Sequence, residues 1–116
     1  MRDVMNHIAM RLGWQELPRP HAWGSEAEVW RQDATTDLPL LTTDNPIVFA
    51  AYAKAAMANR GWIVERGDRL RAGTATPIMY ACDADGNVGS GVEFDPCDPC
   101  SEAIATLTAI NEALCL

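Results

Sequence analysis

The residues with the most obvious chemical potential are Cys97 and Cys100, which form a C-x-x-C pair. Tetrahedral zinc needs four soft ligands, usually two such pairs or one pair with histidines. The chain has one pair only, and His7 and His21 lack ligand spacing. Redox pairs of this kind follow a strand in a βαβ unit, although the expected place of Cys100 in a first helical turn would activate its thiol. We favour reduced structural thiols and no metal, with zinc and redox roles as alternatives.

The run Asp83-Ala84-Asp85-Gly86-Asn87 imitates the opening of a calcium-binding loop. An EF-hand needs Gly at the sixth position and a bidentate Glu at the twelfth, where this chain has Val88 and Phe94. Asp and Gly are equally typical of a hairpin turn, which is the interpretation we favour. The chain also lacks the G-x-S-x-G, P-loop and H-E-x-x-H motifs. We therefore expect no catalytic residues, no cofactor and no enzymatic activity.

Two of the four tryptophans lie close to arginines in a stretch without regular periodicity. Trp23 and Trp30 accompany Arg19 and Arg31 there. Aromatic rings beside guanidinium groups are typical of a site that stacks a base and binds its phosphate, or of a protein–protein hot spot. We interpret these four residues as candidate ligand-binding residues. The alternative is that the rings pack over the sheet or in a dimer interface.

Charge is distributed unevenly along the chain. All nine basic residues lie before Ala72, whereas the remaining residues include seven acidic side chains and account for the net charge of −7. An acidic surface repels phosphate backbones, so we expect no nucleic acid partner. No apolar run approaches the roughly 20 residues needed to span a membrane, and residues 1–4 lack the apolar core of a signal peptide. We expect a soluble, cytoplasmic protein without a membrane partner.

The length indicates a single domain, residues 1–116. Apolar spacing predicts a first helix over about residues 3–12, before Gly13. Residues 15–43 form a long connection of the kind that carries function or hides short strands. Asn45 or Asp44 as N-cap, with Pro46 in the first turn, predicts a second helix that runs through residue 60 and ends at Gly61. A third helix is expected from about Asp98 to residue 114.

Between the second and third helices the apolar period changes to two, which is typical of strands. Residues 62–66 and 69–72 flank Gly67-Asp68, which we interpret as a tight hairpin turn. Residues 78–82 and 92–94 form a second pair around the turn at Asp85. The elements together predict an α+β domain, in which an antiparallel β-sheet with meander topology is layered with three α-helices.

Short motifs lie in a characteristic order along nearly the whole chain. They are Ile8-Ala9, Leu12-Gly13-Trp14, Leu38-Pro39, Thr43-Asp44, Gly61-Trp62 and Glu102-Ala103-Ile104. With the amphipathic helix and the β-meander between them, these motifs resemble the phage ABA-sandwich domain family. The resemblance implies an ABA-type sandwich of helix, sheet and helix, and a phage or prophage origin, which places the protein in the host cytoplasm. It implies no particular activity.

The sequence supports two functional hypotheses. The first is a phage-encoded, non-enzymatic anti-defence sponge that sequesters a small host nucleotide immune signal, an anionic ligand bound by the tryptophan and arginine pairs. Homo-oligomers often build such pockets at their interfaces, so we expect a homo-oligomer. The alternative is a protein-interaction module or inhibitor that docks on a host protein through its acidic face. Only the sponge is expected to gain thermal stability from a nucleotide.

Overall fold

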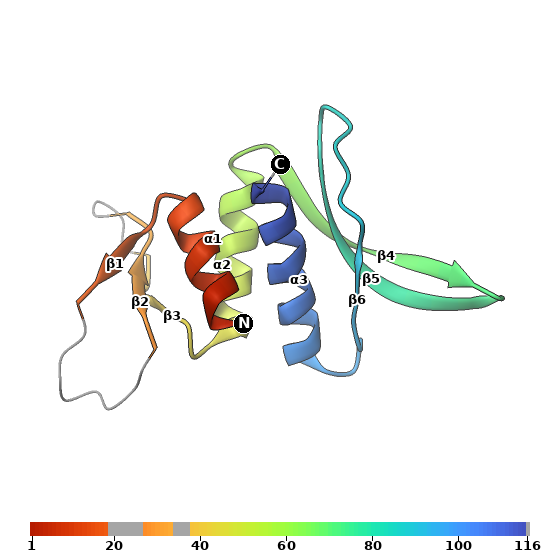
Figure 1. Ribbon diagram of the computed structural model, residues 1–116, viewed down its shortest axis with the longest axis horizontal. Helices are drawn as coiled ribbons and strands as arrows, with labels where there is room; N and C mark the ends of the chain where they lie inside the picture. Colours follow the sequence, from red (N-terminus) through yellow and green to blue (C-terminus); the bar gives the residue numbers. More distant parts are fainter. Residues whose placement is uncertain (19–26, 34–37, 116) are drawn as a thin grey trace.

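The computed structural model describes residues 1–18, 27–33 and 38–115 (Figure 1). The helices are α1 (Arg2–Arg11), α2 (Pro46–Ala58) and α3 (Pro99–Leu114). One antiparallel sheet contains β1 (Gln15–Leu17), β2 (Val29–Arg31) and β3 (Leu41–Thr42), and the other contains β4 (Trp62–Arg71), β5 (Thr74–Asp83) and β6 (Val92–Glu93). The α+β class predicted from the sequence is confirmed. None of the helices in the described ranges is long and apolar enough to cross a membrane.

The three helices lie side by side between the two sheets, with their N-terminal ends at the same end of the molecule (Figure 1). They share one core with both sheets, and its largest fully buried side chains are Met5, Ile8, Leu41, Phe49, Met57, Leu107 and Ile110. The long connection after α1 contains short strands, and these form the small sheet of β1, β2 and β3. This order of layers was not indicated by the sequence, and no described helix covers the outer face of the β4–β5–β6 sheet.

Local sequence explains where α2 and α3 begin. The side chain of Asn45 accepts a hydrogen bond from the amide of Val48, and Pro46 occupies the first turn of α2. Asp98 caps α3 in the same way, accepting from the amide of Cys100 at 2.9 Å. Each cap satisfies an amide that has no partner within its helix, and proline costs nothing at such a position. The helix starts predicted from these residues are confirmed.

The hairpin formed by β4 and β5 differs from the sequence prediction. The two strands pair without interruption from Trp62 opposite Asp83 to Arg71 opposite Thr74, so the turn lies at residues 72–73 and not at Gly67-Asp68. Ala72 and Gly73 both have positive φ, of 49° and 81°, as a two-residue type I′ turn requires. The predicted turn at Gly67 was therefore wrong. A turn at Gly67 would remove most of the hydrogen-bonded pairing between the two ten-residue strands.

Gly67 has a different role, in the middle of β4. A Cβ atom at this position would lie 3.0 Å from Cε1 of Tyr80, whose ring covers the glycine from β5. The glycine thus marks a close cross-strand approach, which is one of the regular uses of glycine within strands. Beyond this point residues 67–77 project from the body of the molecule, and we call this segment the arm (Figure 1).

Candidate functional site

A groove lies between α2 and α3, close to the N-terminal ends of both helices. Its volume is about 250 Å³. Its lining consists of Ile47, Ala50, Ala51 and Lys54 of α2, Met79 of β5, and Pro99, Glu102, Ala103 and Thr106 of α3. The alanines keep the walls short, because each helix presents small side chains toward the other. The groove therefore results from two capped helices that start side by side over β5.

The lining of the groove is suited to binding. Most of its surface is aliphatic, and two ionisable side chains of opposite sign, Lys54 and Glu102, lie at exposed positions. The hydroxyl of Thr106 donates to the carbonyl of Glu102 at 2.9 Å, so it is already engaged within α3. The lining has no Cys, His or Ser, and its groups with acid–base chemistry are Lys54 and Glu102. An apolar side chain with a charged neighbour is the kind of group that fits this surface.

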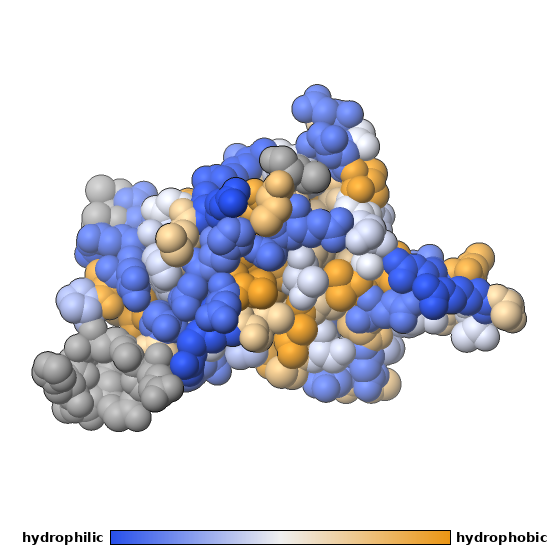
Figure 2. All heavy atoms as spheres, in the orientation of Figure 1, coloured by the Kyte–Doolittle hydropathy of each residue, from blue (hydrophilic) through white to orange (hydrophobic). Residues whose placement is uncertain are grey.

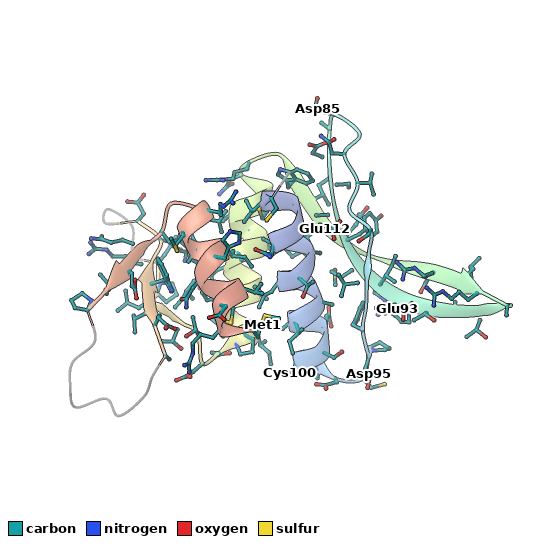
Figure 3. The ribbon with its side chains drawn as sticks, viewed as in Figure 1. Met1, Asp85, Glu93, Asp95, Cys100 and Glu112 are labelled. Carbon is teal, nitrogen blue, oxygen red and sulfur yellow. The ribbon has the colours of Figure 1, made fainter. Side chains whose placement is uncertain are left out.

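Carboxylates gather near the N-terminal end of α3, where Glu102 lines the groove. Asp95, Asp98 and Glu102 are all exposed, and Figure 3 shows Asp95 and Cys100 at the end of the molecule where α3 begins. Two of these carboxylates also accept backbone hydrogen bonds, Asp95 from Cys97 and Asp98 from Cys100. Acidic groups are stabilised at the N-terminus of a helix by the macrodipole. The groove therefore has an apolar lining with one carboxylate and one ammonium group, and two further carboxylates lie near the start of α3.

Exposed apolar side chains are present on both helices, and one of them lines the groove. Ile47 is 49% exposed and lines the groove, while Val48 on α2 and Ile104 on α3 are each 39% exposed. Figure 2 shows apolar atoms scattered over the helix layer, among the polar atoms that dominate that face. Burying a large apolar side chain is favourable compared with leaving it in water. Apolar patches with a polar rim are therefore typical of interaction sites.

The candidate residues from the sequence are not assembled into a stacking site by the described residues. Trp30 is only 4% exposed, and its indole Nε1 donates to Oδ1 of Asn6 in α1 at 2.9 Å. Arg31 is half-buried and donates from Nη2 to Gln15 on the neighbouring strand. Arg19 and Trp23 lie outside the described residues. For Trp30, the geometry supports the packing alternative, because a base cannot stack on a ring whose faces are buried.

The cysteine pair lies at the start of α3. Cys97 and Cys100 are free and exposed, on either side of the capping residue Asp98. Cys82 and Cys115 are also free. Within the described ranges, no group of three or more His, Cys, Asp or Glu side chains is arranged to hold a metal ion. The described residues thus offer no ready-made cage for zinc.

The calcium-like run forms a tight turn. Oδ1 of Asp83 accepts from the amides of Asp85 and Asn87, both at 3.0 Å, and Oδ2 accepts from the Asn87 side chain at 2.9 Å. The hydrogen bond from the Asn87 side chain, assisted by the two amides, holds the pKa of the Asp83 carboxyl below its usual value. The carboxylate is therefore engaged in organising the turn, as the hairpin interpretation expects.

Several polar residues have roles that the sequence did not indicate. The carboxylate of Glu112 on α3 accepts from both the amide and the hydroxyl of Ser90, at 2.9 and 3.0 Å, so it holds the segment before β6. His7 is half-buried, with Nδ1 2.6 Å from Oδ1 of Asn111. No local signal could have revealed these pairs, because their members are distant in sequence.

Comparison with protein-family models, with curated proteins and with solved structures finds no match for this chain. The groove and its surroundings are therefore the features of this chain that bear on its function.

Proposed function

We propose that this protein is a non-enzymatic interaction module, and that its partner is a protein segment with one apolar side and one basic side. The observation that carries this proposal is the apolar groove between α2 and α3, with Glu102 in its lining and two more carboxylates near the start of α3. An amphipathic helix lays its apolar residues into a groove of this kind through positions three and four apart. A basic flank on such a helix would complement Asp95, Asp98 and Glu102.

The size of the groove favours a side chain over a whole nucleotide. Pockets that enclose small molecules usually have roughly 300–1,000 Å³, whereas this groove has about 250 Å³. Its two charged lining groups, Lys54 and Glu102, have opposite signs, so the lining has no net positive charge to attract a phosphate. One bulky apolar anchor fits the available volume better. This reasoning favours the docking hypothesis over the nucleotide sponge.

The biological setting is part of the proposal. In the phage context that the sequence resemblance implies, the partner is a host protein in the host cytoplasm, and binding interferes with its action in defence. The sponge hypothesis depends on Arg19 and Trp23, outside the described residues, and on Trp30, which is buried. It is therefore retained as an outcome of the test below.

The test uses a panel of synthetic helical peptides with one apolar and one basic face, with binding measured by calorimetry. We expect micromolar binding, which corresponds to about 8 kcal/mol, and weaker binding as salt is raised. Ala51→Arg should abolish binding, because Ala51 lines the groove. Ala55→Arg is the matched control, since Ala55 is exposed on the next turn of α2 and does not line the groove.

The other outcomes have definite meanings. Peptide binding that is unaffected by Ala51→Arg would contradict the proposed groove. Stabilisation by cyclic dinucleotides or ADP-ribose derivatives, with the ligand recovered intact, would favour the sponge. Recovery of a cleaved ligand would identify an enzyme.

A further inference from the structure

The strand β4 has an open edge along its full length. The larger sheet has the order β4-β5-β6, so within the described ranges only one side of β4 has a strand partner. Along the other side, alternate residues direct unpaired N–H and C=O groups outward. Natural proteins usually protect such edges with charged side chains, prolines, bulges or very short strands, and of these β4 has charged side chains only. β4 has ten residues, no proline, and a continuous register with β5 that leaves no room for a bulge.

Within two residues of Gly67, each charged side chain of β4 has one of opposite sign at the same distance on the other side of the glycine. The central segment reads Glu65-Arg66-Gly67-Asp68-Arg69. In a two-fold symmetric interface each residue contacts the residue related to it by the axis. If two β4 strands pair antiparallel with the axis at Gly67, Glu65 faces Arg69 of the partner subunit and Arg66 faces Asp68 of the partner subunit. Every charge in the segment then meets one of opposite sign, and opposite charges across a strand pair are stabilising.

Neighbouring registers lose this complementarity. An axis at residue 65, 66, 68 or 69 would place a charged side chain directly opposite its own copy, which is destabilising. With an axis between two residues, each residue whose N–H and C=O point toward the partner strand would face a residue whose N–H and C=O point toward its own β5. An axis at Gly67 satisfies both conditions, because residues equally far from it have the same orientation on the strand.

Two of the charged side chains are already held in place. Arg69 donates to Oε1 of Glu93 at 3.1 Å and to the carbonyl of Ser90 at 2.7 Å. The guanidinium of Arg66 lies over the ring of Phe94, 5.6 Å from its centroid. Both contacts lie on the β5–β6 side of β4, so pairing across the open edge must exchange them for contacts with the partner subunit.

The same register accounts for two exposed apolar side chains. Leu70 is 76% exposed and Ile63 is 58% exposed in the single chain. With the axis at Gly67, Leu70 comes opposite Val64 of the partner subunit, on the face that packs against the helices. Ile63 comes opposite Arg71 of the partner subunit, whose aliphatic stem can cover it.

We propose that two copies of this chain associate by antiparallel pairing of their β4 strands about a two-fold axis at Gly67. The product is a continuous six-stranded sheet, in which residues 68–71 of each arm lie alongside residues 63–66 of the partner subunit. This inference is independent of the groove and of the proposed function.

Sedimentation equilibrium of the full chain tests the association. The wild type should approach twice its monomer mass of 12.6 kDa as the concentration rises, within a range of about 1 μM to 1 mM that covers the affinities expected here. Arg66→Asp and Asp68→Arg should each weaken self-association at least about tenfold, because each places like charges opposite one another. Asp85→Arg is the control, since Asp85 lies in the turn after β5, away from β4 (Figure 3).

A mixture of the two variants gives the decisive result. When Arg66→Asp meets Asp68→Arg, both cross-strand pairs again have opposite signs, so a heterodimer should form although neither variant dimerises alone. An effect within one chain could not be repaired by mixing. A monomeric wild type, a mixture that stays monomeric, or a dimer indifferent to both reversals would overturn the proposal.

If either variant loses its native circular dichroism, the wild type supplies a second measurement. Amides of β4 that point away from β5 should exchange with deuterium more slowly at high protein concentration than at low concentration. Exchange that is independent of concentration would overturn the proposal.

Discussion

The indole Nε1 of Trp30 donates a hydrogen bond to Oδ1 of Asn6 over 2.9 Å, which ties the small sheet to α1. The ring itself lies in the core that the three helices share with both sheets. This position makes Trp30 a residue of the core, and it predicts a phenotype different from that of a residue in a ligand site.

Trp30→Ala should lower the free energy of unfolding by about 3–5 kcal/mol, because a large buried side chain leaves a cavity. Trp30→Phe should cost less, about 1–3 kcal/mol, mainly because Oδ1 of Asn6 loses its donor. Urea unfolding followed by circular dichroism measures both. Leu38→Ala, at an exposed position, should stay within about 0.5 kcal/mol of the wild type. Wild-type stability of Trp30→Ala would show that the ring does not support the core.

Glu112 should control the segment before β6. Glu112→Ala removes both hydrogen bonds to Ser90, and we expect a loss of about 1 kcal/mol in unfolding free energy with faster amide exchange at Ser90. Ser90→Ala removes only the hydroxyl bond and should have a smaller effect. Glu16→Gln, which also removes an exposed carboxylate, serves as the control. Unchanged exchange at Ser90 in Glu112→Ala would refute the contact.

The Tyr80 hydroxyl should titrate at unusually high pH. It donates to Glu65 at 2.5 Å, and this hydrogen bond raises the pKa of Tyr80 above its usual value. Because the folded-state pKa is the higher one, the stabilisation is present at neutral pH and is lost as pH rises from about 10 through the pKa of Tyr80. Ultraviolet titration should show Glu65→Gln shifting this ionisation to lower pH. A titration curve identical to that of the wild type would exclude the hydrogen bond.

The cysteine pair should be dispensable for folding. Both thiols are exposed and free, so Cys97→Ser combined with Cys100→Ser should change the unfolding free energy by no more than about 0.5 kcal/mol. The matched comparison is Asp98→Ala, which removes the cap of α3 and should cost about 1 kcal/mol. Thermal unfolding under reducing conditions compares the two. A greater loss in the double serine variant would indicate that the thiols bind a metal or each other.

The sequence by itself determined the features that depend on neighbouring residues. Asn45 with Pro46, and Asp98 with Pro99, begin α2 and α3 because a cap and its amide are only two or three residues apart. Gly61 follows α2 with φ of 84°, a conformation that glycine adopts without steric cost. The α+β class followed from such local signals and from the change of apolar period.

The tertiary structure decided what distant residues do to one another. Gly67-Asp68 has good turn chemistry, but the pairing of β4 with β5 over their whole length outweighs that local preference and places the turn at Ala72-Gly73. In the same way, Trp30 carries no local mark of its bond to Asn6, and the groove exists only because α2 and α3 pack over β5. Local preferences amount to a fraction of a kcal/mol for each residue, whereas burial and continuous pairing act on many residues together.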